Sequence, residues 1–334
     1  MDDNTRIPML EPYTVKLMVS ALSETEDYNH RMLNVPEMWK KTKGAGVKVV
    51  VLDTGCPEHI DLKISGHKDF SGSDSPYDNA GHSTHVCGII GAVENGIGVK
   101  GIAPECELYC GKVLGDDGCG SRSSIVDGIK WAVDEVHADV INMSLGCAPN
   151  LITTQSFKSI CQYAHDKGVV MCCAAGNDAG NVNVPANLPT TIAVAAVDRN
   201  REKAYFTCHG SEVDFAAGGV DVFSTWLGNK YAKLSGTSMA TPVITGAAAL
   251  IIAAAKAEGK KITPDAVYDK LVGIAIDVEE PGKDEFTGNG IPVFTSQVDV
   301  DDDDDQETPA ADDGDSWFAR LVRWVASLFS KRKK

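Results

Sequence analysis

The chain has 334 residues, with 47 acidic side chains against 31 lysines and arginines and a formal net charge of −16. This length can hold one large domain with flanking pieces, and the acidic balance argues against nucleic-acid binding. The longest continuous apolar run, at 247–255, is too short to span a bilayer.

Strand-like and helix-like stretches alternate along most of the chain. Apolar, β-branched runs that favour buried strands lie at 47–52, 139–143 and 169–173. Helical stretches are expected at 124–136, 154–167 and 237–259. This alternation predicts an α/β fold in a single domain, with a mostly parallel twisted sheet and helices on both faces.

Two candidate catalytic residues follow in chain order. Asp53 comes at the carboxyl end of the first apolar run, which is the edge where open α/β sheets build their sites. His82 stands where a helix should begin, in Gly-His-Ser-Thr-His. Taken singly, Asp53 could be an ordinary turn aspartate and His82 a structural histidine.

Two more candidates follow later in the chain. The run at 169–173 ends in Ala-Ala-Gly-Asn, so the Asn177 amide can donate to a developing oxyanion, an interaction worth roughly 2.7–4 kcal/mol. Ser238 follows a Gly-Thr turn and opens a long Ala-rich stretch. A helix N-terminus favours nearby negative charge, which suits a nucleophile. The alternative for Ser238 is a plain helix cap.

Together these residues appear in the order Asp, His, Ser, which is also the order in subtilisin. From about Pro36 to Val293 the chain resembles the subtilisin-like serine proteases. The resemblance implies that Ser238 is the nucleophile, His82 its general base and Asp53 the partner of the imidazole. It also implies that Asn177 and the Ser238 N–H bind the oxyanion. We therefore expect a serine endopeptidase that acts through an acyl-enzyme; the alternative is a non-catalytic, membrane-tethered binding protein on a protease fold.

The resemblance also implies a substrate groove. The expected substrate-binding residues form an edge strand, an opposite wall and a pocket: Gly118, Cys119 and Gly120; Ser144, Leu145 and Gly146; Ala174, Ala175 and Gly176. Asn183 and Asp178 are expected to make the pocket mouth polar and acidic, and Arg122 to line an outer pocket. The family motif His-Gly-Thr-His here contains Ser83 after the first histidine, and its second histidine, His85, is expected to be structural.

The amino terminus is most similar to that of intracellular subtilisins, because Leu10-Glu11-Pro12-Tyr13 resembles their Leu-Ile-Pro-Tyr motif, with Glu11 as the departure. The resemblance implies an inhibitory extension at 1–20 ahead of a peptidase domain at 21–296. Proline lacks an N–H and fixes φ, so a segment in the groove would be a poor substrate across that bond. The alternative is an ordinary disordered terminus.

The expected location is the cytoplasm, or the inner membrane face by peripheral attachment. No apolar stretch follows the acidic start Met1–Asn4, so no secretory signal is expected. Ten cysteines are better suited to a reducing compartment than to an oxidising one. No Cys-x-x-Cys pair suggests a metal site instead, and Cys119 and Cys147 are expected to border the groove.

A structural calcium ion is expected from a further resemblance, since the loop at 93–99 is similar to a family loop that binds calcium. The implied ligands are one distant carboxylate, one amide and backbone carbonyls: Asp61, Val93, Asn95, Ile97 and Val99. The alternative is a glycine-rich turn.

The carboxyl terminus is expected to lie apart from the peptidase domain. Residues 297–315 form an acidic, low-complexity linker. Residues 316–334 predict a basic amphipathic helix, with Trp317, Leu321, Trp324 and Leu328 on one face. Such a helix suits a membrane surface, which we favour, or a protein surface, including that of the enzyme itself. The family resemblance further suggests a homodimer.

Overall fold

The computed structural model describes residues 4–10, 13–18 and 23–295. The chain divides into two units, Met1–Val298 and Asp299–Lys334. The acidic linker and the amphipathic helix expected at 297–334 lie outside the described residues, as do Glu11 and Pro12 of the amino-terminal motif.

The centre of the fold is a seven-stranded parallel sheet with the order β10-β9-β8-β7-β3-β5-β4. In chain order its strands are β3 (Lys48–Asp53), β4 (Ile64–Asp69), β5 (Glu107–Lys112), β7 (Val140–Met143), β8 (Val170–Ala174), β9 (Ile192–Val197) and β10 (Phe215–Gly218). The inner strands β7, β8 and β9 are buried along their whole length, as expected of parallel strands covered on both faces.

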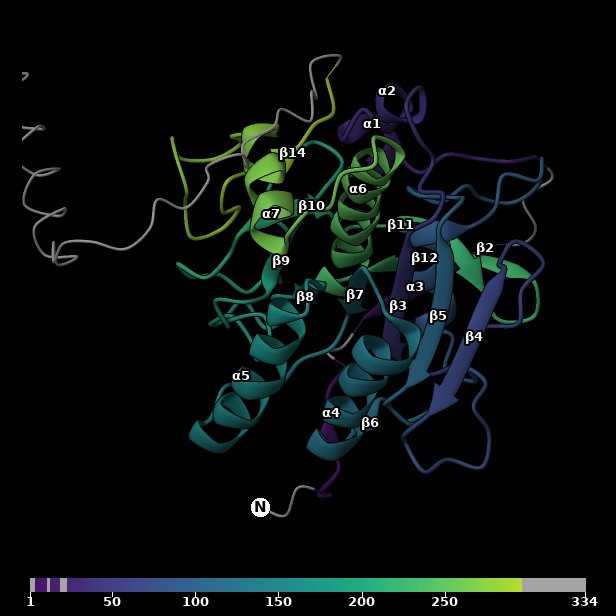
Figure 1. Cartoon of the computed structure of the whole chain (residues 1–334), viewed down its shortest axis with the longest axis vertical. Helices are drawn as coiled ribbons and strands as arrows, with labels where there is room; N and C mark the ends of the chain where they lie inside the picture. The colour runs from purple at the N-terminus through teal and green to yellow at the C-terminus, as the bar shows by residue number, and fades with distance from the viewer. Residues whose placement is uncertain (1–3, 11–12, 19–22, 296–334) are drawn as a thin grey trace, which may run out of the picture. The chain divides into compact units, whose positions relative to one another are not determined.

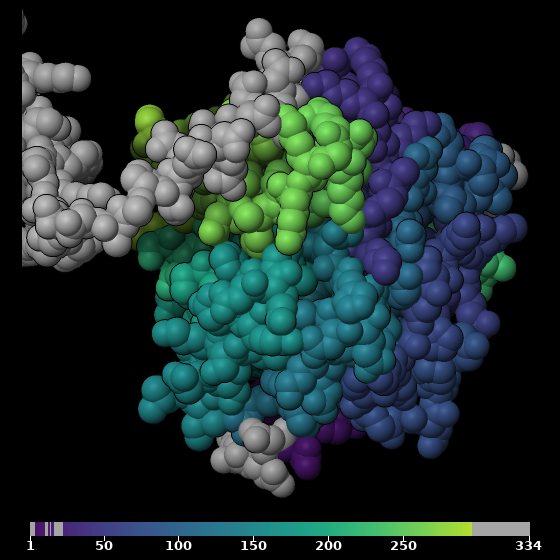
Figure 2. Space-filling model, in the orientation of Figure 1, coloured from purple at the N-terminus to yellow at the C-terminus, as the bar shows by residue number. Residues whose placement is uncertain are grey.

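Helices flank this sheet, which confirms the predicted fold class. The longest, α6 (Thr237–Ala257), packs against α3 (His82–Gly91) and against strands β7 to β10. A second pair, α4 (Arg122–Trp131) and α5 (Leu151–Asp166), pack against each other. Figure 1 draws this pair side by side, and Figure 2 shows their teal residues at the surface of the same face.

Smaller elements complete the domain. Short helices are α1 (Tyr28–Met32), α2 (Val35–Trp39) and α7 (Pro264–Gly273). A three-stranded antiparallel sheet joins β2 (Thr14–Met18), β12 (Lys230–Ser235) and β11 (Val222–Trp226). Two-stranded pairs are β1 (Ile7–Pro8) with β6 (Cys119–Gly120), and β13 (Ala275–Ile276) with β14 (Ile291–Pro292).

Two helices begin earlier in the chain than the sequence predicts. The stretch expected at 124–136 begins at Arg122 and changes at Ala132 into a π-helical turn, η1 (Ala132–Val136). The stretch expected at 154–167 begins at Leu151, because the Asn150 side chain accepts the N–H groups of Ile152 and Thr153.

Helix α6 also bears on the question of membrane spans. By length and mean composition this helix, polar residues included, could cross a bilayer. No continuous apolar run within it is long enough to do so. Its most apolar window is wholly buried inside the domain. The length and apolar character of α6 are therefore explained by its place as the core helix of the domain.

Candidate active site

Asp53 and His82 are joined at the carboxyl edge of the sheet. Asp53 is the last residue of β3, is fully buried, and accepts the Thr54 N–H at 2.7 Å. Its two carboxylate oxygens lie 2.8 and 2.9 Å from His82 Nδ1. With the proton on Nδ1 facing a carboxylate, His82 Nε2 is left as the basic nitrogen.

The position of His82 is fixed by a second carboxylate that the sequence patterns do not single out. Asp78 accepts the N–H groups of Ala80 and Gly81 through Oδ1, and both the N–H and the hydroxyl of Thr84 through Oδ2. These bonds satisfy N–H groups at the start of α3, which would otherwise lack intrahelical partners. The start of the helix that carries His82 is thereby held in place.

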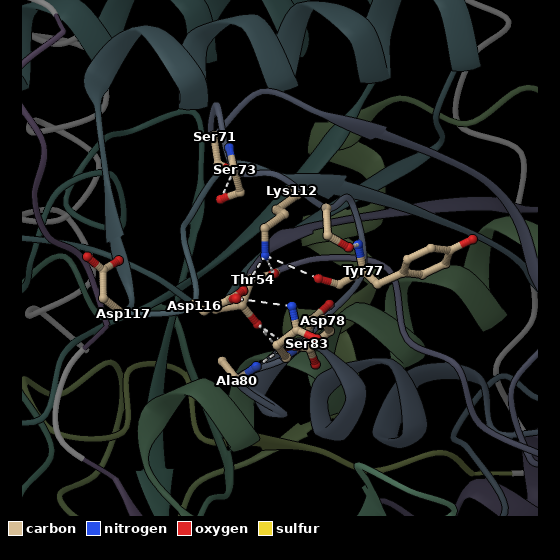
Figure 3. Close-up of polar contacts among 12 residues, drawn as sticks. Thr54, Ser71, Ser73, Tyr77, Asp78, Ala80, Ser83, Lys112, Asp116 and Asp117 are labelled. Atoms are coloured by element: carbon tan, nitrogen blue, oxygen red, sulfur yellow. Dashed lines mark hydrogen bonds and ion pairs between the residues drawn. The ribbon is translucent and has the colours of Figure 1, made fainter.

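The hydroxyl of Thr54 links this capping arrangement back to the strand of Asp53. It donates to Asp78 Oδ1 at 2.9 Å and accepts the Ser83 N–H at 3.1 Å (Figure 3). Gly81, the cap residue of α3, has φ of +88° and lies against the Trp226 ring, where a Cβ would come within 2.7 Å. Only glycine suits this position, since it combines a left-handed backbone with close packing.

A buried lysine is hydrogen-bonded to the loops that carry Thr54 and Tyr77. Lys112, the last residue of β5, donates to the carbonyls of Thr54 and Tyr77 and to Asp116 Oδ1 at 2.7 Å (Figure 3). Asp116 in turn accepts the Asn79 amide at 3.0 Å. A buried ammonium group needs hydrogen-bond partners. Here the partners lie in the loops that follow strands β3, β4 and β5.

Ser238 lies in the first turn of α6 and is 5% exposed. Its hydroxyl donates to the Ser144 carbonyl at 3.2 Å, and the Ser144 hydroxyl returns a bond to the Ser238 carbonyl at 2.9 Å. His82 Nε2 is buried and has no hydrogen-bond partner among the described residues. In this structure the Ser238 hydroxyl is therefore bonded to a carbonyl oxygen and not to His82 Nε2, the nitrogen that would have to accept its proton.

Asn177 is oriented so that its amide N–H₂ faces the site. Its Oδ1 accepts both the N–H and the hydroxyl of Thr237, at 2.8 and 2.9 Å. The Nδ2 atom is buried and has no partner among the residues the structure describes. A buried unsatisfied donor costs about 1–3 kcal/mol, a cost that is recovered when an oxyanion forms beside it.

A pocket opens next to Ser238. It is lined by Met9, Leu145, Gly146, Ala174, Gly176, Asn183, Thr237 and Ser238. Of the residues expected to line it, Ala175 does not: it is fully buried, and its backbone bonds to Val194 and Asn183 instead. Asp178 is also absent from the lining, because its carboxylate is turned to the Cys208 thiol and the Gly180 N–H.

The chain's own N-terminal segment (residues 4–10) lies along the expected substrate strand (Figure 1). Ile7 and Pro8 pair antiparallel with Gly120 and Cys119, and the Gly118 carbonyl accepts the N–H groups of Met9 and Leu10. On the opposite wall, the Gly146 N–H donates to the Met9 carbonyl at 2.9 Å. Met9 itself is only 1% exposed and is one of the residues that line the pocket.

Comparison of the sequence with known proteins identifies the family. Residues 44–290 match the model of the subtilase family, peptidase S8. The chain belongs to the subtilase family.

Several curated relatives share close to half of the aligned residues with this subtilase. The thermostable alkaline protease of Halalkalibacterium halodurans is 45% identical over 234 residues, which is 69% of this chain and 64% of that protein. Subtilisin Savinase of Lederbergia lenta is 47% identical over 212 residues, 62% of this chain and 77% of that one. Subtilisin E of Bacillus subtilis is 45% identical over 63% of this chain. The chain spans less than two thirds of the length of the Halalkalibacterium protein.

The second histidine of the motif in this subtilase has a structural environment. His85 is fully buried, and its Nε2 lies 3.1 Å from the carbonyls of both Val222 and Ala232. Burial lowers the pKa of His85 to about 3, so the ring is neutral at ordinary pH. Arg122 is also buried at the start of α4, and its guanidinium reaches the Ser156 hydroxyl at 3.4 Å.

Some of the expected calcium ligands are joined by hydrogen bonds, and oxygen atoms are the donors that a hard cation prefers. No group of three or more His, Cys, Asp or Glu side chains suited to a metal ion occurs in the described part of the chain. Asp61 is fully buried, accepting Asn95 Nδ2 through Oδ1 and both the Val99 N–H and the Tyr231 hydroxyl through Oδ2. The buried carboxylate therefore faces neutral donors. Within the loop, the Gly96 and Gly98 carbonyls accept the N–H groups of Glu24 and Thr25.

Proposed function

We propose that this protein is a serine endopeptidase that hydrolyses peptide bonds within proteins. The observation that carries the proposal is the buried Nε2 of His82, which has no partner in the described part of the chain and whose other ring nitrogen is held by the Asp53 carboxylate. The Nδ2 atom of Asn177, likewise without a partner there, is supporting evidence. Membership of the subtilase family makes a peptidase the expected use of these groups.

Catalysis begins when the Ser238 hydroxyl leaves the Ser144 carbonyl and attacks the carbonyl carbon of the substrate. His82 Nε2 takes the hydroxyl proton, and Asp53 stabilises the imidazolium. The tetrahedral oxyanion is bound by Asn177 Nδ2 and the Ser238 N–H. His82 then gives its proton to the leaving amine as the C–N bond breaks, leaving an ester on Ser238. Water, deprotonated by the same nitrogen, hydrolyses the ester and restores the serine.

The substrate main chain binds in the groove by adding a strand. The backbone of Gly118, Cys119 and Gly120 is already paired with an extended segment in this structure, which supports such β-addition. One substrate side chain enters the pocket beside Ser238. Met9 and Leu145 are among the residues that line that pocket, which has about 10 Å³ of free space in this structure; its apolar lining favours an apolar substrate side chain.

The enzyme is made as a self-inhibited precursor of the intracellular type. Support comes from the N-terminal segment, which occupies both walls of the groove, and from Tyr13, whose ring lies against His82. Removal of about the first twenty residues, the length given by the family resemblance, frees the site; exposed termini are common sites of such cleavage. All ten cysteines are free thiols, which supports action in a reducing cytoplasm.

Calcium is part of the same proposal, with Asp61, Asn95 and the carbonyls of Val93, Ile97 and Val99 as ligands. The bound ion would supply structural stability rather than chemistry. It would also place a positive charge next to the buried Asp61 carboxylate, which accepts hydrogen bonds from Asn95, Val99 and Tyr231. The residues of the loop fit such an ion in their chemistry.

The tail at 316–334 is proposed to hold the enzyme at an anionic membrane surface. Its aromatic and aliphatic face and its cationic end support this. Binding should be stronger to anionic than to neutral vesicles and should weaken as the salt concentration rises. If the full chain and a chain ending at Val298 are recovered equally in the supernatant after co-sedimentation with vesicles, docking on a protein is favoured instead.

A homodimer is suggested by the family resemblance. It would be detected by analytical sedimentation as twice the mass of one chain.

The test that separates an enzyme from a non-catalytic binding protein is covalent labelling. A serine-directed phosphonate should add one group to the protein, at Ser238, once the groove has been freed of its own segment. The Ser238→Ala protein is the matched control and should remain unlabelled. A binding protein on a protease fold would give no adduct in either case, and would hydrolyse no peptide.

A further inference from the structure

The loop that carries Asn177 is paired with a later segment of the chain. The Phe206 carbonyl accepts the Ala179 N–H at 2.8 Å, and the Gly180 carbonyl accepts the His209 N–H at 2.9 Å. These bonds are made by backbone groups, which every residue except proline can supply. They set the course of the loop that follows Asn177.

Cys208 lies within that later segment and contacts the residues on both sides of Asn177. Its N–H donates to the Gly176 carbonyl at 2.9 Å, and its thiol donates to Asp178 Oδ1 at 2.7 Å. Cys208 is fully buried, whereas Asp178 lies at the surface. The proposed oxyanion donor is thus held through both of its chain neighbours by one buried cysteine.

The sulfur atom of Cys208 also packs closely against the loop. Gly176 has φ of +119°, and a Cβ built on it would come within 2.7 Å of Cys208 Sγ and 2.6 Å of Asn183 Nδ2. Glycine suits this left-handed backbone and leaves the space that the sulfur atom occupies. The sulfur atom therefore blocks a shift of the loop towards Cys208, and a shift away would break the bond to Asp178.

The bond between Cys208 and Asp178 joins a lasting donor to a lasting acceptor. Burial, together with the bond to Asp178, raises the pKa of Cys208 to about 12, so the thiol keeps its proton. The bond from the thiol, together with the Gly180 N–H, lowers the pKa of Asp178, so the carboxylate stays ionised. Hydrogen bonds to ionised groups are stronger than those between neutral groups, and this one persists at neutral pH.

The start of α6 supplies the other anchor of this loop. Thr237 donates its N–H and its hydroxyl to Asn177 Oδ1, and its hydroxyl accepts the Gly176 N–H at 3.2 Å. The direction of Asn177 Nδ2 therefore depends on two residues. Thr237 acts on the amide itself, and Cys208 acts on the backbone before and after it.

We infer that Cys208 is a positioning residue for the oxyanion donor, because through Gly176 and Asp178 it holds Asn177 with its Nδ2 atom directed into the site. This rests on the proposed peptidase activity and names a residue that serves it without touching substrate. An oxyanion donor is most effective when it is aligned before the charge develops. Since Asp178 lies at the surface, where water can replace the lost bond, removing the thiol should cost less than removing the donor.

The first test compares Cys208→Ala, which lacks the thiol donor, with Cys208→Ser, whose hydroxyl can donate to Asp178. Rates are measured on the full chain after its activity has reached a plateau, per active site as counted by burst titration. We expect Cys208→Ala to lower kcat about three- to ten-fold, as for the loss of one hydrogen bond, with little change in KM. Cys208→Ser should recover most of this loss. Cys161→Ala, which removes a buried thiol from α5, is the matched control and should keep the wild-type kcat.

A second test shows whether Cys208 acts through Asn177. In the Asn177→Ala protein no amide remains to be aligned, so adding Cys208→Ala should lower kcat no further. Asp178→Ala removes the acceptor and should lower kcat as Cys208→Ala does. The two changes together should then cost no more than either alone. A merely structural role would not give this pattern, because it would lower kcat whether or not Asn177 is present.

Three outcomes would overturn the inference: an unchanged kcat in Cys208→Ala, no recovery in Cys208→Ser, or an equal loss in the wild-type and Asn177→Ala backgrounds. If Cys208→Ala does not fold, as judged by circular dichroism, Asp178→Ala decides, and wild-type kcat in that protein would overturn the inference too. Absence of hydrolysis by the wild type, with no phosphonate adduct, would instead count against the proposed function.

Discussion

The ring of Tyr13 lies against the imidazole of His82, with centroids 5.1 Å apart and planes inclined by 48°. Burial, with the nearby negative charges of Asp53 and Asp78, raises the pKa of Tyr13 to about 12. Tyr13 thus remains a neutral phenol against His82, the proposed catalytic base. This contact joins the N-terminal segment to the proposed triad at a point separate from Met9, which lines the pocket.

From this relationship we expect the full-length protein to start slowly. Deleting the residues before Ser20 should raise the initial rate of peptide hydrolysis and remove any lag, because both the pocket and the face of His82 become accessible. Met9→Asp should shorten the lag in the full chain, since a carboxylate is costly to bury in that pocket. Thr5→Ala, an exposed change in the same segment, is the control. Equal progress curves for all four proteins would exclude self-inhibition.

Catalysis should depend on Ser238 and Asn177 to different degrees. Ser238→Ala should abolish peptide hydrolysis and leave the circular dichroism spectrum unchanged. Asn177→Ala should lower kcat by about 10²–10³ with a smaller change in KM, because the lost donor acts mainly on the oxyanion. Burst titration of active sites checks both. Wild-type turnover by the purified Ser238→Ala protein would refute the assignment.

The buried neutral His85 should make the fold sensitive to acid. Its pKa is about 3 in the folded protein against an ordinary value of 6.5, so the unfolded chain binds the proton more readily. Its contribution to stability is therefore present above pH 6.5 and is lost as the pH falls from there towards 3.

Urea unfolding measured across that pH range, in the Ser238→Ala background to prevent self-digestion, checks this expectation. His85→Gln should be less stable at neutral pH but should lose less free energy of unfolding on acidification. Parallel pH profiles for the two proteins would show that His85 does not titrate as expected.

Chelation should lower the melting temperature and hasten self-digestion, because an ion bound by the native state alone stabilises that state. Asp61→Ala should lose most of this response. Tyr231→Phe is the matched control: it removes one hydrogen bond to Asp61 and leaves every oxygen ligand in place, so it should be destabilised and still respond to chelator. If chelator changes neither the melting temperature nor the rate of autolysis of the wild-type protein, the calcium ion is absent.

The sequence was sufficient for the α/β class and for the positions of the candidate catalytic residues. Asp53 at a strand end, His82 at a helix start and Ser238 in a first helical turn are local features, which hydrophobic periodicity and turn chemistry reveal directly. The order of strands in the sheet does not follow from these patterns, since strand pairing depends on contacts between distant segments.

Only the tertiary structure shows which residues that are distant in the sequence come into contact. Asp78 looks like an ordinary turn aspartate in the sequence, and only folding brings Thr54 and Thr84 to its two oxygens. Likewise, Asp178 and Ala175 stand beside the predicted site in sequence but turn to other partners. The placement of Met9 at the pocket depends on pairing between residues 7–8 and 119–120. Short-range rules constrain the local backbone, whereas which side chains meet is determined by packing across the whole domain.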